Sequence, residues 1–125
     1  MVVLRVQDGE GRGPYRPGFS ARWSDPNGPI CKPWWIEIGE TFEVAHQRFC
    51  EGYHWGCGFQ DIDRLRSWFT ARELKALDRL GFCLVTVEPD IIVAETPSQI
   101  VFGTLLPLAD ARPRMRLVSK LARAA

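Results

Sequence analysis

Thr70–Val87, TARELKALDRLGFCLVTV, is the stretch that decides the fold. Its first residues, Thr70 to Glu73, form a capping box that opens a helix, and Gly81 is placed to end that helix. The β-branched and aromatic residues at 82–87 then predict a strand. The sequence therefore predicts a helix that leads directly into a strand.

Shorter elements are predicted on both sides of this stretch. Asp61 is a helix cap, and the apolar residues that follow it recur at helical spacing. Strands are predicted for the runs at 2–6, 91–94 and 98–102, and a short amphipathic helix is predicted for 41–52. Because the helices are separated in sequence from the later strands, we expect an α+β domain with a mostly antiparallel sheet and two or three helices. The predicted core contains Leu65, Trp68, Leu74, Leu77, Val85, Ile100 and Phe102.

Length and composition limit the domain organisation. The chain has 125 residues, 46% of them hydrophobic, which is enough for one core and too few for two domains. We expect a single domain over residues 1–110. Residues 111–125 are basic and contain no acid, so they predict a tail or short helix. A solvated tail is favoured over a helix that binds acidic protein or nucleic acid.

Charge and hydropathy indicate where the protein works. The net charge is +1, so no overall field attracts nucleic acid or an anionic membrane, and neither is an expected partner. No run reaches the roughly 18 apolar residues of a membrane helix, and the N-terminus lacks the long apolar core of a signal peptide. We therefore expect the protein in the cytoplasm.

The cysteines and histidines were weighed as metal ligands. The four cysteines are expected to be free thiols in a reducing compartment. Two cysteines and both histidines lie close together in the sequence, but they contain no CxxC pair. We therefore expect no bound metal and favour the interpretation that these thiols and imidazoles are not ligands. The candidate ligands are His46, Cys50, His54 and Cys57.

Two loop regions have compositions typical of binding surfaces. Residues 8–18 are rich in glycine and contain Arg12 and Arg16, whose charges and backbone amides could hold an anion. Residues 19–39 combine prolines with large aromatics, which suit either a partner-binding surface or a small core. The aromatic candidates for partner binding are Trp23, Trp34 and Trp35.

Three motifs together resemble a family of small prophage-type proteins. They are Arg5–Ser20 (RVQDGEGRGPYRPGFS), Cys57–Phe69 (CGFQDIDRLRSWF) and Gln99–Phe102 (QIVF). Their three-part layout is in turn similar to the ADP-ribosyltransferase fold. In that fold a first-strand arginine, a central aromatic-x-serine and a late glutamate before an apolar strand surround NAD.

The resemblance implies a role for individual residues. Arg5 would take the place of the first-strand arginine and hold a phosphate or ribose of NAD. Asp61 stands where that fold has its serine, and Gln99 stands where it has its glutamate. The remaining residues implied in binding the cofactor are Arg12, Tyr15 and Arg16.

Gln99 decides between the functional hypotheses. A glutamine keeps the glutamate's hydrogen bond but loses its charge, which weakens stabilisation of an oxocarbenium-like transition state. The favoured interpretation is therefore a non-catalytic, phage-derived protein that binds and inhibits a host protein, such as an anti-CRISPR or another anti-defence inhibitor. The alternative is an active ADP-ribosyltransferase or NAD glycohydrolase in which Glu95 or Asp61 supplies the charge. A third interpretation is a prophage accessory domain without a cleft function.

Overall fold

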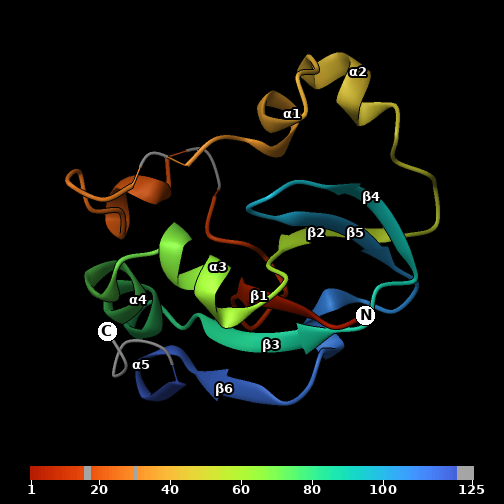
Figure 1. The fold of residues 1–125 in the computed structure, drawn as a ribbon. Coiled ribbons are helices and arrows are strands. Elements are labelled where there is room, and N and C mark those ends of the chain that lie inside the picture. The colour runs from red at the N-terminus through yellow and green to blue at the C-terminus, as the bar shows by residue number, and fades with distance from the viewer. Residues whose placement is uncertain (16–17, 30, 121–125) are drawn as a thin grey trace.

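Two antiparallel three-stranded sheets form the framework of the computed structural model, which describes residues 1–15, 18–29 and 31–120 (Figure 1). We call them sheet A and sheet B. Sheet A has the order β1-β3-β6, with β1 (Val3–Gln7), β3 (Cys83–Val87) and β6 (Arg114–Arg116). Sheet B has the order β2-β5-β4, with β2 (His54–Gly58), β5 (Ile100–Thr104) and β4 (Ile91–Glu95). The α+β class predicted from the sequence is confirmed.

The two sheets meet where β1 passes the end of β2. The backbone N–H of Leu4 donates to the carbonyl of Phe59 at 2.9 Å, and the N–H of Phe59 donates back to Leu4 at 2.7 Å. A Cβ at position 58 would lie 2.3 Å from Val3 Cγ1 and 2.6 Å from the Leu4 carbonyl oxygen. Gly58 is therefore required for the strands to approach this closely.

The helices α3 (Ile62–Trp68) and α4 (Ala71–Arg79) begin at the predicted caps. Asp61 accepts a hydrogen bond from the Arg64 N–H at 2.8 Å. Thr70 and Glu73 exchange side-chain to backbone hydrogen bonds at 3.0 and 2.9 Å, as a capping box requires. Both predicted helix starts are confirmed.

The larger core lies between sheet A and these two helices. It consists of apolar side chains from β1, β3, α3, α4 and the loops: Val6, Trp23, Phe59, Leu65, Phe69, Leu74, Leu77, Phe82, Leu84 and Leu117. The predicted core residues are buried except Trp68, which is half-buried. Trp68 packs against this core with one side and lines a cavity with the other, so it is only partly covered.

A much smaller core lies under α1 (Trp34–Glu37) and α2 (Phe42–His46), which Figure 1 shows at the top, above sheet B. Its buried members are Trp34, Ala45 and Val101. The helix predicted over 41–52 starts at its Thr41 cap but ends at His46. The chain then turns so that Phe49 stacks on Trp55 of β2, with ring centroids 4.7 Å apart.

The strands differ from their predicted bounds in instructive ways. Strand β2 was not predicted, because Gly56 and Gly58 weaken the strand pattern of its five residues. Strand β5 begins at Ile100, two residues later than predicted, because Gln99 is held in a turn. In that turn the Thr96 N–H donates to the Gln99 carbonyl at 2.9 Å, and the Gln99 N–H donates to Thr96 Oγ1 at 3.0 Å.

The described part of the basic C-terminal segment packs on the domain. It forms β6 and α5 (Leu117–Lys120), and Leu117 is fully buried in the larger core. Arg116 of β6 binds Asp78 of α4 through two hydrogen bonds, at 3.0 and 2.6 Å. Within the described residues, no helix is long and apolar enough to cross a membrane.

Candidate functional site

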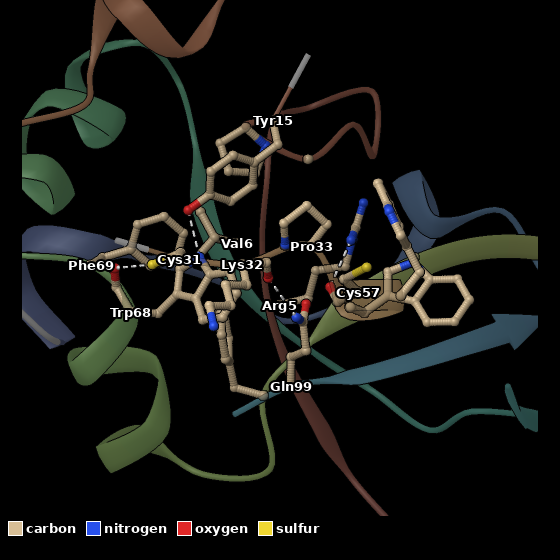
Figure 2. Close-up of a pocket in the computed structure, with 16 residues that line it drawn as sticks. Arg5, Val6, Tyr15, Cys31, Lys32, Pro33, Cys57, Trp68, Phe69 and Gln99 are labelled. Carbon is tan, nitrogen blue, oxygen red and sulfur yellow. Dashed lines mark hydrogen bonds between the residues drawn. The ribbon is translucent and has the colours of Figure 1, made fainter. Parts of the chain in front are cut away.

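A cavity of about 440 Å³ opens beside the junction of the two sheets (Figure 2). Its lining comes from β1, β2, α1, the residue before β5, two loops and the end of α3. The residues that line it include Arg5, Gly13, Tyr15, Cys31, Lys32, Trp34, Trp35, Gly56, Cys57, Phe59, Trp68, Phe69 and Gln99. Two of the three residues that the sequence placed in a catalytic role, Arg5 and Gln99, therefore share one cavity. Arg5 lies on β1 of sheet A, whereas Gln99 lies in the turn before β5 of sheet B, so the cavity joins residues from the two halves of the framework.

Arg5 provides the buried positive charge of this cavity. It is only 6% exposed and donates to Gln7 Oε1 at 2.9 Å, to the Cys57 carbonyl at 2.8 Å and to the Gly11 carbonyl at 3.0 Å. All three acceptors are neutral, and Arg5 forms no ion pair with any residue that the structure describes. Burial lowers the pKa of Arg5, and the nearby Cys57 and Asp8 oppose this shift. Arginine nevertheless stays charged in proteins, so the cavity wall carries a cation.

Gly56 makes room for the Arg5 guanidinium. A Cβ at position 56 would lie 2.9 Å from Arg5 Nη1 and 3.0 Å from its Cζ, closer than side chains normally approach. Gly13 also faces the guanidinium, although a Cβ there would meet Nη2 at an ordinary 3.6 Å. Gly56, one of the two glycines that weaken the strand pattern of β2, is therefore needed to leave space for the Arg5 side chain.

Gln99 faces the cavity from the turn before β5. Its Nε2 donates to the Lys32 carbonyl at 3.2 Å and to Glu37 Oε1 at 2.5 Å. Glu37, at the end of α1, was not among the acids considered from the sequence. Nothing in the local pattern could have identified it, because 62 positions separate it from Gln99.

Six of the sixteen residues that line the cavity are aromatic. Tyr15 stacks on Phe69 at 6.2 Å between ring centroids, and its hydroxyl accepts a hydrogen bond from Trp68 Nε1. Burial around that hydroxyl raises the pKa of Tyr15. Trp34 and Trp35 meet edge to face at 6.1 Å. Tyr15, predicted to bind a cofactor, therefore lies at the cavity.

The three tryptophans predicted to bind a partner have different surroundings. Trp23 is 5% exposed and donates from Nε1 to the Pro14 carbonyl at 3.2 Å, so most of it belongs to the larger core. Trp34 is 7% exposed and belongs to the smaller core. Trp35 is half-buried and is the most accessible of the three.

The charges that line the cavity are positive. Among the described residues, its charged lining consists of Arg5 and Lys32, with no aspartate or glutamate. Cys31 adds a neutral thiol, because burial, with a contribution from the carboxylate of Glu73, raises its pKa to about 11. The cavity is therefore cationic and aromatic.

Arg12 is not one of the cations that line the cavity. It pairs with Asp8 and Glu10 of its own loop, each at 3.0 Å. Burial raises the pKa of Asp8, but the N–H groups of Arg12 and Glu10 and the Arg12 guanidinium outweigh this and bring that pKa below its usual value. The positive charge of Arg12 is thus engaged within the loop. Arg16, the other predicted arginine of this loop, lies outside the described residues.

The remaining predicted acids do not line the cavity. Asp61 caps α3 and pairs with Arg64 at 2.5 Å. Glu95 lies on β4 with its side chain exposed. Neither residue lies where it could supply the charge that Gln99 lacks.

The histidines and cysteines weighed as ligands are divided between two segments. His46 ends α2 and Cys50 follows it, whereas His54 and Cys57 lie on β2. No group of three or more His, Cys, Asp or Glu side chains suited to a metal ion occurs in the described part of the chain. All four cysteines are free thiols.

Comparison with models of known protein families gives a match. A family model described as bacteriophage T4 Y00F protein matches residues 1–105, which include β1 to β5 and every residue of the cavity wall named above. Neither the curated proteins nor the solved structures give a match. Because the family model covers most of the chain, this phage-type protein belongs to the bacteriophage T4 Y00F protein family.

Proposed function

We propose that the cavity binds an anionic nucleotide, with NAD as the first candidate, and that the protein binds this ligand without cleaving it efficiently. The observation that carries the proposal is Arg5, a buried cation at the wall of an aromatic cavity that has no acid in its described lining. The resemblance to the ADP-ribosyltransferase layout, in which an arginine of the first strand faces NAD, points in the same direction.

The energetics of Arg5 favour an anionic ligand. A buried charge without a charged partner is costly, and an anion with good hydrogen-bond geometry offsets that cost. A guanidinium has five N–H donors, and acceptors among the residues that the structure describes take three of those of Arg5. Two donors therefore remain for a phosphate, and charge-assisted hydrogen bonds of this kind are about twice as strong as neutral ones.

The rest of the cavity suits the other parts of a nucleotide. Its aromatic wall, with Tyr15, Trp34 and Trp68, can stack on a planar base or nicotinamide ring. Its volume of about 440 Å³ lies within the range of about 300–1,000 Å³ that is usual for small-molecule sites. Lys32 adds a second cation at the entrance. These residues fit NAD in charge and in ring chemistry.

Position 99 limits the chemistry. Bound NAD would supply a ribose carbon with nicotinamide as its leaving group. Gln99 can accept a hydrogen bond from a sugar hydroxyl but brings no negative charge, and preorganised charge is usually the largest contribution to such catalysis. We therefore expect binding without rapid release of nicotinamide.

Calorimetric titration of NAD into the wild-type protein and two lysine variants tests the proposal. Lys32→Ala removes the exposed cation at the cavity and leaves the Lys32 carbonyl that holds Gln99 in place. It should weaken NAD binding about five-fold, which corresponds to the roughly 1 kcal/mol of an ion pair with an exposed side chain. Lys75→Ala, on the exposed face of α4, is the matched control and should leave the affinity unchanged. Absence of saturable NAD binding in the wild-type protein would contradict the proposal.

A second candidate function is inhibition of a host protein, for example a CRISPR or other defence complex. The observation that favours it is a surface that we call the α1–α2 surface, where Ile36, Phe42 and Val44 are 52%, 52% and 50% exposed. Exposed apolar side chains grouped on neighbouring helices are typical of protein-binding sites. Trp35 contacts Phe42 at 5.2 Å between ring centroids and would add an aromatic anchor.

Purification of tagged protein from a bacterial host extract separates the two candidates. If the protein is an inhibitor, a host protein should copurify with wild type and with Lys32→Ala, and should be lost with Phe42→Ala. If the protein binds a nucleotide, NAD binding should instead be weakened by Lys32→Ala and unchanged in Phe42→Ala, because Lys32 lines the cavity and Phe42 does not.

A further inference from the structure

Glu37 joins the helix that carries the tryptophans to the turn that carries Gln99. Its Oε2 accepts a hydrogen bond from Ser98 Oγ at 2.6 Å. Its Oε1 accepts from Gln99 Nε2 at 2.5 Å and from Thr96 Oγ1 at 3.3 Å. One carboxylate therefore receives three donors from the turn between β4 and β5.

These contacts fix the orientation of the Gln99 amide. Its two Nε2 hydrogens go to the Lys32 carbonyl and to Glu37, both of which can only accept. The reversed amide would place Oε1 against two acceptors and would lose both hydrogen bonds. The amide oxygen is therefore the atom that remains for the cavity, and Figure 2 shows the side chain directed into it with the Lys32 contact drawn.

We infer that Glu37 is a positioning residue, which holds the Gln99 side chain so that its amide oxygen faces the cavity as a hydrogen-bond acceptor. Because Glu37 is itself a carboxylate in contact with position 99, it also disfavours a glutamate at that position. The orientation of Gln99 does not depend on the proposed nucleotide site. Only the role of its amide oxygen in binding a ligand rests on that proposal. A ligand that binds here must offer a donor, such as a sugar hydroxyl, to Gln99 and an anion to Arg5.

Substitution of Gln99 by glutamate tests whether Glu37 disfavours a carboxylate at position 99. The new carboxylate would lie in contact with Glu37, and two adjacent carboxylates cannot both ionise readily, so the pair should retain a proton. The raised pKa means that the folded variant binds more protons than the unfolded chain. Its stability should then fall as the pH rises above the unfolded carboxyl value of about 4.3.

Few other charged groups surround this pair. Lys32 and Arg5 lie on the cavity side, and Cys31, whose pKa Glu37 helps to raise, lies on the loop before α1. Arg64 of α3 donates to the Pro97 carbonyl in the same turn.

The first test is the melting temperature between pH 5 and pH 8 for Gln99→Glu and for the exchange variant Glu37→Gln/Gln99→Glu. The single variant should lose about 5 °C or more over this range relative to wild type. The exchange variant keeps one amide and one carboxylate, so its pH profile should parallel that of wild type. Gln47→Glu, at the exposed end of α2, is the control for the added charge. A wild-type profile in the single variant, or equal losses in both, would overturn the inference.

The second test observes the amide directly. In ¹⁵N-labelled protein, the Gln99 side-chain NH₂ signals are those that disappear in Gln99→Glu. They should exchange slowly with solvent in wild type and at least ten-fold faster in Glu37→Ala, roughly the effect of losing one strong hydrogen bond. Fast exchange in wild type would overturn the inference. Neither test uses NAD, so a failure of the nucleotide proposal would leave both results interpretable.

Discussion

The helices that pack on sheet A and the helices that pack on sheet B bury very different amounts of apolar surface. The helices α3 and α4 on sheet A bury a continuous apolar cluster that also includes Trp23 and Leu117. Among the described residues, the helices α1 and α2 above sheet B bury Trp34 and Ala45 against Val101, while Ile36, Phe42 and Val44 stay half exposed. Hydrophobic stabilisation scales with the apolar area removed from water, so sheet A and its helices form the stable part.

This difference divides the cavity wall between a rigid side and a weakly held side. Arg5 and Phe69 belong to the elements of the larger core. Trp34 and Trp35 are carried by a helix of four residues whose main tie to the domain, outside the small core, is the Glu37 carboxylate. Local opening follows regions with few buried contacts, so we expect α1 to open before β1.

The largest effect should come from the core of sheet A. Leu77 is fully buried on α4, and Leu77→Ala should lower the free energy of unfolding by about 2–5 kcal/mol through lost apolar contact and a residual cavity. Denaturant unfolding measures the change. Leu106→Ala, at a position that is 73% exposed, is the matched control and should cost less than about 0.5 kcal/mol. Equal effects of the two variants would remove the distinction between core and surface.

The next effect should come from the junction that joins the two parts. Gly56→Ala places a methyl group 2.9 Å from the Arg5 guanidinium, which must shift and strain its three hydrogen bonds. The variant should lose about 1–3 kcal/mol of stability and should bind NAD more weakly. Gly9→Ala is the control, since its new methyl group would meet only Arg114, at 4.0 Å. If Gly56→Ala is as stable as Gly9→Ala, the close packing around Arg5 is not required.

A smaller effect should appear in acid, at the packing of the C-terminal segment on α4. The hydrogen bond from Arg116 is the main cause that lowers the pKa of Asp78, and backbone N–H groups of Leu117 and Val118 contribute. A lowered folded pKa means that the stabilisation is complete above the unfolded value of about 3.9 and is lost as the pH falls below it.

Melting temperatures between pH 6 and pH 2.5 test this linkage. The wild-type protein should lose stability more steeply in acid than Asp78→Asn, whose neutral side chain does not titrate. Asp63→Asn, on the exposed face of α3, should keep the wild-type slope. Parallel curves for wild type and Asp78→Asn would contradict the assignment.

The smallest effect on stability is expected on the α1–α2 surface. Phe42 is 52% exposed, and its ring packs against Trp35 and His46. Phe42→Ala should therefore cost less than about 1 kcal/mol in denaturant unfolding, since little of its area is removed from water. A loss as large as that of Leu77→Ala would show that both sheets carry equally important cores.

Sequence patterns alone were sufficient for the part of the fold that local interactions determine. The caps at Asp61 and Thr70 were predicted because their hydrogen bonds join residues three positions apart. The stop at Gly81 and the strand that follows it were predicted from the conformational preferences of their own residues. The apolar spacing of Leu74 and Leu77 likewise identified the face of α4 that meets the core. The sequence also identified Arg5 and Gln99 as candidates, through a resemblance of motifs.

Only the tertiary structure decided how those residues become a site. Strand β2 was hidden because its glycines serve contacts with Val3 and Arg5, which lie more than 50 positions away. Glu37 was hidden because its partners lie about 60 positions further along the chain. The tryptophans could not be sorted into core and surface, since burial depends on which sheet covers each ring. Local propensity fixes the elements, whereas long-range packing decides which side chains share a cavity and which are removed from water.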